Sequence, residues 1–360
     1  MHYKSIQAGR AIAALIVVFF HLGATIALSK YFGQPLLGRA FSFGHAGVHF
    51  FFVLSGFIIM NVHMKDLFQS EKVKSFLIKR CVRIYPIYWL IFIAVFISAL
   101  AVPSLRGAVP SDMPLILKAL ALLPLDKSVV GGTGAPVLIV AWSLQYELYF
   151  YGLFSLAILS RWLAVALAVV LAAGLMLGLG SGEFPASFIW SDWIVLFFLG
   201  VGVAVLVRIE KSNSINSVLA IGISSVLLVG LAAFEVIGKA GEVEGLRIFY
   251  GLGFSGLIFG FVCYEKSGRV LPLFLSNQFT QTLGNASYFL YLIHFPLISL
   301  LLKLVIAIDL SGFVGALIAF VVVALACVVV AVAGHLLIEL PMQKWLMSRF
   351  TPKPTFAVVQ

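Results

Sequence analysis

The sequence predicts an all-α protein, a polytopic transmembrane bundle of about ten spans with both termini in the cytoplasm. Of its 360 residues, 62% are hydrophobic and only 11% are charged, whereas soluble domains contain about 25% charged residues. Charged side chains also separate apolar runs of roughly 20 residues, the length of a helix that crosses a bilayer. These two observations exclude a soluble globular protein. We expect a membrane-embedded domain over residues 1–345 and a short cytoplasmic tail over 346–360.

The expected spans are centred near residues 20, 55, 93, 147, 171, 200, 225, 256, 294 and 325. An even number of spans puts both termini on one side of the membrane. Most of the 24 Lys and Arg residues then fall on that side, which the positive-inside rule assigns to the cytoplasm. Acidic residues of the outer segments, Glu235 among them, offset the outer basic residues. The net charge of +10 thus belongs to the cytoplasmic face, and nucleic acid is not an expected partner.

The first span carries Arg10 and His21 on one helix face. Nineteen residues lie between Arg10 and Lys30, which is enough to cross a bilayer, and no cleavable signal peptide is expected. Helical geometry places His21 about 16 Å beyond Arg10 and almost on the same face. The pattern predicts a cation at the membrane boundary and a proton acceptor near the midplane. An ionisable group at that depth indicates a functional site; a histidine hydrogen-bonded to a neighbouring helix is the alternative.

A basic segment, residues 65–83, follows the second span and mixes apolar and basic side chains at roughly helical spacing. This pattern is typical of a helix that lies in the membrane interface, with Pro86 at the start of the third span. Arg80 and Arg83 are one turn apart and suit a bidentate grip on an anionic ligand such as a phosphate. Anchoring to anionic membrane lipids explains the segment equally well.

The longest outer connection covers residues 103–136 and is rich in proline. A long loop above a membrane cavity is often a lid or a platform for a substrate, and a passive connector is the alternative. In the next outer turn, Trp190 and Trp193 are expected to be membrane-interface anchors.

Two spans combine polar side chains on one helix face. In the fourth span, Ser143, Glu147 and Tyr151 recur at i, i+4 and i+8, with Trp142 beside them. A carboxylate in hydrocarbon needs a proton, a cation or a wet cavity. We therefore expect catalysis or helix–helix hydrogen bonding along this stripe.

In the ninth span, Ser287, Tyr291 and His294 recur at i, i+4 and i+7 and are expected to line a cavity, although a structural histidine would also explain the pattern. No metal is expected: His45 and His49 are four residues apart but lack a third ligand, and the three cysteines suggest no site. His335 and Glu339 are expected to form an ion pair or a hydrogen bond.

Five motifs occur in order beyond the first span. They are GVHFFFVLSGFII (47–59), KRCVRIYPIYW (79–89), WSLQYELYFY (142–151), SYFLYLIHFP (287–296) and LIELP (337–341). With the spacing of Arg10 and His21, they make the chain resemble the acyltransferase-three family of integral membrane acyltransferases, best known for O-acetylating bacterial surface and secreted glycans. The resemblance runs from about Ile6 to Trp345, with His49 as a departure from the pattern. We expect no hydrolase-like domain after the last span, as in the stand-alone form of the family.

The resemblance implies transfer of an acyl group, usually acetyl, from cytosolic acyl-coenzyme A to a hydroxyl of a carbohydrate, free or lipid-linked. It implies a multi-pass protein of the cell inner membrane, in contact with membrane lipids. The catalytic residues are then expected to be His21 as general base, Arg10 and Glu147, and the residues that bind the coenzyme Arg10, Arg80 and Arg83. The substrate cavity is expected to include Trp142, Ser143, Tyr151, Ser287, Tyr288, Tyr291 and His294.

Two alternatives stay open from the sequence. Ten spans with His and Glu inside the membrane are also typical of a proton-coupled transporter or flippase of a glycan or small molecule, although no inverted repeat is evident. Within the acyltransferase hypothesis, direct attack by the acceptor and a stored acyl-histidine are both compatible with the residues.

Overall fold

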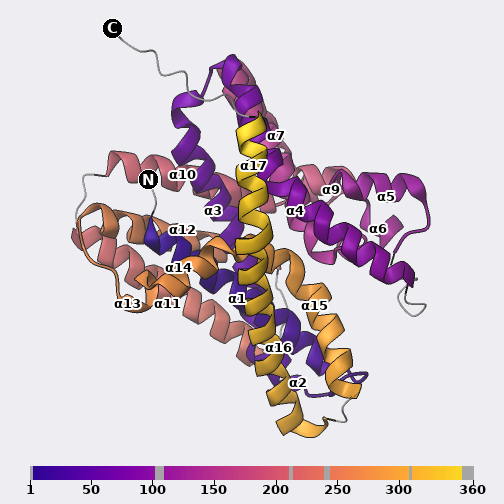
Figure 1. The fold of residues 1–360 in the computed structure, drawn as a ribbon. Helices are drawn as coiled ribbons and strands as arrows, with labels where there is room; N and C mark the ends of the chain where they lie inside the picture. The colour runs from indigo at the N-terminus through magenta and orange to yellow at the C-terminus, as the bar shows by residue number, and fades with distance from the viewer. Residues whose placement is uncertain (1–2, 102–108, 211–213, 239–243, 308–309, 351–360) are drawn as a thin grey trace.

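The computed structural model of the chain describes residues 3–101, 109–210, 214–238, 244–307 and 310–350 (Figure 1). The described residues form helices and no strand, which confirms the predicted all-α class. The α-helices are α1 (Lys4–Ala27), α2 (Pro35–Ala40), α3 (Ala46–His63), α4 (Val73–Ala101), α5 (Met113–Leu120), α6 (Lys127–Val130), α7 (Trp142–Leu159), α8 (Arg161–Met176), α9 (Ala186–Ile189), α10 (Trp193–Ile209), α11 (Ser214–Gly238), α12 (Arg247–Lys266), α13 (Leu273–Ser276), α14 (Gln278–Asn285), α15 (Ser287–Ala307), α16 (Gly312–Gly334) and α17 (Leu340–Phe350). Short helical turns are η1 (Ser42–His45), η2 (Met64–Asp66), η3 (Ser70–Lys72), η5 (Ile139–Ala141), η6 (Leu179–Ser181), η7 (Glu244–Leu246) and the π-turn η8 (His335–Glu339).

All ten positions expected for membrane spans lie in helices. Within the described part of the chain, eight helical segments are long and apolar enough to cross a membrane, and the chain is a multi-pass membrane protein. The helices α7 and α8 are not among these segments, because α8 has 16 residues and the first half of α7 is polar. The ten-span count and the cytoplasmic termini stay predictions. Residues 351–360 of the expected tail lie outside the described residues.

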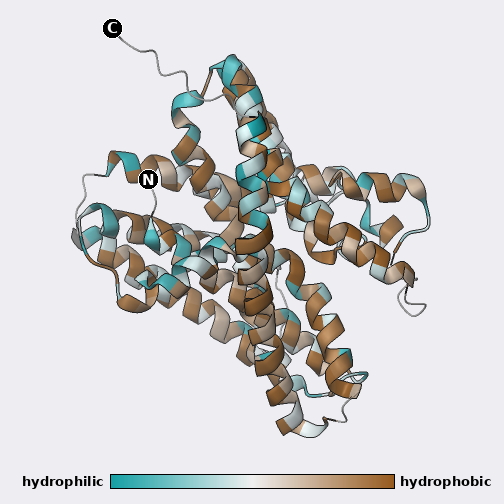
Figure 2. Cartoon of the chain, in the orientation of Figure 1, coloured by the Kyte–Doolittle hydropathy of each residue, from teal (hydrophilic) through white to brown (hydrophobic). Residues whose placement is uncertain are grey.

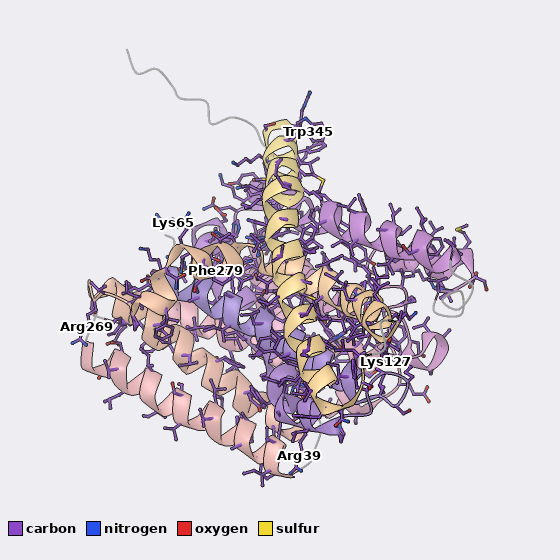
Figure 3. All side chains as sticks on the ribbon, turned by 60° about the horizontal axis from the view of Figure 1, so that its bottom comes forward. Arg39, Lys65, Lys127, Arg269, Phe279 and Trp345 are labelled. Atoms are coloured by element: carbon purple, nitrogen blue, oxygen red, sulfur yellow. The ribbon has the colours of Figure 1, made fainter. Side chains whose placement is uncertain are left out.

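The surface of the bundle is apolar over most of its height. Figure 2 shows hydrophobic residues along the lower part of the long front helix, where α16, η8 and α17 are continuous, and hydrophilic residues toward its upper end. Figure 3 labels Lys65 and Trp345 in the upper half of the view and Arg39 and Lys127 in the lower half. Arg269, which the charge pattern places on the same side as Lys65, is also labelled in the lower half, so this view does not separate the two predicted sides.

Close backbone contacts fix α3 between α1 and α10. A Cβ atom at Gly47 would lie 2.4 Å from the carbonyl oxygen of Ala13 on α1. A Cβ atom at Gly56 would lie 1.9 Å from the carbonyl oxygen of Phe197 on α10, and Gly200 approaches α3 equally closely. Only glycine permits such approaches, which are typical of helix packing in membranes. They hold the inner face of α1 against the centre of the bundle.

The basic segment and the third span form one continuous helix. The helix α4 runs through Pro86 from Val73 to Ala101, so no helix begins at Pro86; the interface position of the segment before it and the start of the membrane span stay predictions. A proline removes one backbone hydrogen bond, which a membrane helix tolerates where neighbours compensate. The carbonyl that loses its helical donor at Pro86 is that of Val82, four residues earlier, and nearby Tyr288 of α15 donates to the carbonyl oxygen of Ile84 at 2.7 Å and joins α15 to this part of α4. As a result, Arg80 and Arg83 project from a helix within the bundle.

The described part of the outer connection is hydrogen-bonded to α4. Tyr88 donates to the carbonyl oxygen of Ala119 at 2.7 Å, and Trp89 and Tyr85 donate to the next two carbonyls along the chain, each at 2.9 Å. The last carbonyls of a helix have no partner within it, so these three side chains complete the end of α5. Of the residues 103–136, those numbered 103–108 lie outside the described residues.

The close crossing of α3 and α10 predicts a stability effect. Gly56→Ala must push the helices apart, and overpacking of this kind costs about 1–3 kcal/mol, or about 1–4 °C in the thermal-unfolding midpoint in detergent. Gly202→Ala is the matched control, because Gly202 lies on α10, the partner helix of this crossing, with nothing within 4 Å of its added Cβ. Equal midpoints for Gly56→Ala and the unmodified protein would contradict the packing described.

Candidate functional site

A cavity lies where α1, α3, α4, α7, α10 and α15 meet, and the empty space there, about 780 Å³, includes its opening to the outside. The lining residues are Arg10, Val48, Phe51, Phe52, Leu54, Ser55, Ile58, Ile59, Arg80, Arg83, Ile84, Ser143, Leu144, Glu147, Tyr151, Phe197, Ser287, Tyr288 and Tyr291. Each predicted stripe therefore contributes to one cavity wall, because the helical period of α7 and α15 turns their polar faces inward.

Three arginines line this cavity together. Arg10 comes from α1, and Arg80 and Arg83 come from adjacent turns of α4. Glu147 interacts electrostatically with all three guanidinium groups, and Glu339 of the π-turn η8 interacts with Arg10 and Arg83. With both carboxylates ionised, the three cations face two anions. The cavity therefore has an excess positive charge, which suits an anionic ligand.

Glu147 is also hydrogen-bonded to neutral side chains. The phenol of Tyr151, one turn further along α7, donates to Glu147 Oε1, and Ser55 Oγ on α3 donates to the same oxygen at 3.5 Å. One turn before Glu147 on α7, Ser143 Oγ lies 2.7 Å from the hydroxyl of Tyr291 on α15. These contacts join α3, α7 and α15 around the cavity and give each of the side chains named here a hydrogen-bond partner.

Two polar atoms of lining residues remain without a partner among the described residues. They are Ser287 Oγ and Arg80 Nε, and both are buried. Native proteins rarely leave buried donors unsatisfied. A polar ligand in the cavity would give these two atoms their missing hydrogen bonds.

His21 is half-buried and lies against α15, outside the set of residues that line the cavity. Its ring centroid is 5.2 Å from that of His294 and 5.3 Å from that of Phe295. His294 is fully buried, lies 5.8 Å from Tyr291 between ring centroids, and keeps its Nδ1 3.1 Å from the carbonyl oxygen of Leu290. Its Nε2 has no partner among the described residues. The two imidazoles thus lie behind the wall that Tyr291 forms.

Trp142 does not line the cavity either, because it packs into an aromatic cluster next to it. Its ring lies 4.8 Å from Trp193 and 6.0 Å from Phe52, which does line the cavity. Trp193 is 8% exposed and stacks under the guanidinium of Arg247 at 4.0 Å. The expected role of Trp193 as an interface anchor is therefore wrong: its side chain belongs to the core. In sum, of the predicted site residues, His21, Trp142 and His294 lie outside the cavity lining, and the others form it.

A second polar cluster lies at the N-terminal end of α3. His45 Nε2 lies 3.1 Å from a carboxylate oxygen of Glu235, and Tyr250 donates to the same carboxylate at 3.0 Å. His49 stacks on Tyr250 and Trp193. Glu235 is 1% exposed, so it does not act as the surface acid that the sequence predicts. Within the described residues, no group of three His, Cys, Asp or Glu side chains could hold a metal.

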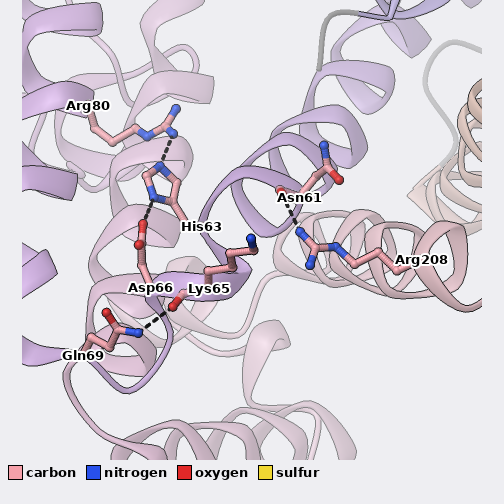
Figure 4. A network of polar contacts seen from close by, with 7 residues as sticks. All are labelled: Asn61, His63, Lys65, Asp66, Gln69, Arg80 and Arg208. Carbon is pink, nitrogen blue, oxygen red and sulfur yellow. Dashed lines mark hydrogen bonds and ion pairs between the residues drawn. The ribbon is translucent and has the colours of Figure 1, made fainter. Parts of the chain in front are cut away.

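Two other pairs of titratable side chains occur at helix ends. The predicted contact between His335 and Glu339 is confirmed at 2.7 Å. His63 and Asp66, which the sequence analysis missed, contact Arg80 and are drawn in Figure 4. The available signal was a histidine and an aspartate three residues apart at the end of the second span, a spacing that places side chains on one helix face.

The fold and the cavity define a multi-pass helical membrane protein with a buried, cation-rich ligand site. The family profile described as "Acyltransferase domain" matches residues 3–334. The chain belongs to this family and is a membrane acyltransferase.

A similar protein is the exopolysaccharide production protein ExoZ of Rhizobium meliloti (strain 1021). It is 28% identical over 318 residues, which cover 85% of this chain and 91% of that protein. No solved structure matches the chain significantly.

The cavity predicts a pattern of thiol labelling. In a Cys81→Ser background, which removes the exposed native thiol, Ser55→Cys should react with a small anionic methanethiosulfonate. Ser98→Cys is the control, because Ser98 is exposed among apolar residues of α4. A charged cleft raises the local concentration of an opposite charge by about tenfold or more, so the anionic reagent should also outpace a cationic one of equal size at Ser55→Cys. Equal labelling of the two cysteines, or a preference for the cationic reagent, would contradict this account of the cavity.

Proposed function

We propose that the protein transfers an acyl group, with acetyl as the expected group, from cytosolic acyl-coenzyme A to a hydroxyl of a surface or secreted carbohydrate. The observation that carries this proposal is the convergence of Arg10, Arg80 and Arg83 on one cavity of a membrane acyltransferase. Guanidinium groups bind phosphates through paired hydrogen bonds, and coenzyme A carries several phosphates. The three arginines would hold the nucleotide end of the donor.

The spacing along α1 supports a donor that extends away from the arginines. Arg10 and His21 are separated by about 16 Å along the helix. An extended pantetheine arm spans about 15–20 Å, so phosphates bound near Arg10 put the thioester at the depth of His21, where positioning lowers the barrier to reaction. Ser287 Oγ, unpartnered among the described residues, lies along the same cavity and would bond the amides of this arm.

His21 would act as the general base. A neutral imidazole removes the proton from the acceptor hydroxyl while the oxygen forms a bond to the thioester carbonyl carbon. The tetrahedral intermediate then expels the thiolate, which takes the proton back from His21, so the products are the ester and free coenzyme A. His294 lies 5.2 Å from His21 between ring centroids. Because Tyr291 and His294 separate His21 from the cavity, the donor has to displace one of these side chains to bring its thioester to the base.

Glu147 would orient the reacting groups at the cavity wall. Its carboxylate accepts hydrogen bonds from Tyr151 and Ser55 and interacts electrostatically with the three arginines. An anion at this position would offset part of the charge of the guanidinium groups. Tyr288 and Tyr291 keep hydrogen bonds to Ile84 and Ser143 and would contact the pantetheine arm or the acceptor with their rings.

The acceptor is proposed to be a carbohydrate, free or linked to a lipid. The relative ExoZ is described as an exopolysaccharide production protein, which supports a polysaccharide or its precursor as the acceptor class. A donor from the cytosol and an acceptor destined for the surface also support a location in the cell inner membrane. Membrane lipids surround the exposed apolar side chains of the bundle.

An assay separates this proposal from a transporter or flippase of a glycan. The purified protein should release free thiol from acetyl-coenzyme A when a carbohydrate acceptor is present. A transporter would instead move solute into liposomes without thiol release. An acyl-histidine would be trapped as labelled protein when labelled donor is supplied without acceptor.

Removal of the base should abolish transfer. General base catalysis contributes about 10²–10⁴-fold to a rate, so His21→Ala should lose activity by about that factor while the protein still purifies with an unchanged unfolding midpoint. Retention of near-normal turnover in a folded His21→Ala protein would rule out the base role.

Removal of a donor-binding arginine should raise the donor concentration needed for saturation. A hydrogen bond to a charged group is worth about 1.5–3 kcal/mol, so Arg83→Gln should raise the donor KM by about tenfold or more. Lys79→Gln is the control, because Lys79 is an exposed cation on the same helix. If the two variants show the same donor KM, the basic segment binds lipid and not the coenzyme.

A further inference from the structure

A chain of three polar side chains connects the surface at the end of α3 to the cavity (Figure 4). His63 Nδ1 lies 2.7 Å from Asp66 Oδ2, and Arg80 Nη2 lies 2.9 Å from His63 Nε2. The side chain of Asp66 is 30% exposed and that of His63 is 5% exposed. Arg80 is 8% exposed and lines the cavity. The contacts therefore lead from a partly hydrated carboxylate to a buried guanidinium.

The two contacts fix the hydrogen positions on His63. A guanidinium has only donors, so Arg80 must donate to His63 Nε2. This nitrogen is then the acceptor of a neutral imidazole, and the hydrogen on Nδ1 is donated to Asp66. The carboxylate thus selects the tautomer that presents a lone pair to Arg80. A carboxylate behind a histidine orients metal-binding imidazoles in the same way, but here the group oriented is a guanidinium.

The turn that carries His63 and Asp66 is itself held from both sides. Gln69 Nε2 donates to the carbonyl oxygen of Lys65 at 2.7 Å, which closes the turn after η2. From α10, Arg208 Nη2 donates to the carbonyl oxygen of Asn61 at 2.9 Å. Both contacts are drawn in Figure 4. The imidazole is therefore attached to a fixed part of the backbone and provides a rigid acceptor.

Arg80 also has a side-chain hydrogen bond with Tyr151, whose phenol in turn donates to Glu147. Its guanidinium lies over the rings of Phe76 and Tyr151, at 5.5 and 5.6 Å from their centroids, and its Nε has no partner among the described residues. Glu147 is an anion within electrostatic range. Without His63, the guanidinium would be free to turn toward Glu147 and would offer fewer donors to a ligand.

We propose that His63, oriented by Asp66, is a positioning residue that holds the Arg80 guanidinium toward the cavity for a phosphate of the donor. An arginine has five N–H donors, so the contacts with His63 and Tyr151 leave the others for the ligand. The inference rests on the proposed function, which assigns Arg80 to acyl-coenzyme A. It adds two residues to the donor site that do not touch the donor.

Steady-state kinetics with acetyl-coenzyme A on the purified full-length protein test this proposal. His63→Phe keeps a ring against Phe76 but removes the acceptor. It should raise the donor KM by about tenfold and change kcat by less than about twofold, because a uniform binding contribution is lost. His63→Gln keeps an acceptor near the position of Nε2 and should restore the donor KM to within about threefold of the unmodified protein.

Two further comparisons exclude a general structural effect. In an Arg80→Gln background, His63→Phe should cause no further rise in donor KM, because residues that act through one contact are not additive. Lys65→Gln removes a neighbouring exposed cation without touching the three side chains, and at 0.15 M salt its donor KM should stay within about twofold. Unfolding midpoints of all variants serve as the folding control.

The outcomes separate the two levels of the argument. If Arg80→Gln raises the donor KM and His63→Phe does not, the positioning role is overturned and the proposed function stands. If His63→Phe lowers kcat without changing the donor KM, or if His63→Gln fails to restore the KM, positioning is also overturned. If the unmodified protein releases no thiol from acetyl-coenzyme A, or if Arg80→Gln leaves the donor KM unchanged, the assignment of Arg80 to the donor fails first.

Discussion

Positive charge inside an apolar bundle has to be compensated, and this constraint explains most of the site. A buried guanidinium is stable only with anions and hydrogen-bond acceptors around it. Arg10, Arg80 and Arg83 receive two carboxylates, Glu147 and Glu339, and Arg80 also receives an imidazole acceptor. The compensation leaves one cation in excess. An anionic donor would supply the missing negative charge. The excess positive charge, which is unfavourable in the empty cavity, would then contribute to the affinity for the donor.

The sequence predicts which side chains share a helix face but not which faces meet. The spacing of Ser143, Glu147 and Tyr151, and of Ser287, Tyr291 and His294, predicts two polar stripes, and all of these residues except His294 line the cavity. Composition predicts the fold class, because long apolar runs allow little but helices in a membrane. Pro86 does not begin a helix, because a membrane helix tolerates a proline in its interior.

Other errors of the sequence-based prediction arise from contacts in the tertiary structure. Glu235 lies near a chain segment that composition assigns to the outer surface, yet its contacts with His45 and Tyr250 bury it. Trp142 is adjacent in sequence to a cavity residue but turns toward Trp193. His63 and Asp66 are separated from Arg80 by a turn and by the start of α4, so their joint role depends on how two helix ends meet. The sequence motifs that carry the family resemblance give no information on contacts of this kind.

The proposed chemistry requires the donor to lie across the cavity with its phosphates at the arginines and its thioester near His21. The most direct measurement is a structure of the protein with bound coenzyme A. The account predicts phosphate oxygens within hydrogen-bond distance of Arg10, Arg80 and Arg83, the His63 contact to Arg80 retained, and the sulfur beside His21 after displacement of Tyr291 or His294. Coenzyme A bound elsewhere, with the three arginines paired only with Glu147 and Glu339, would contradict it.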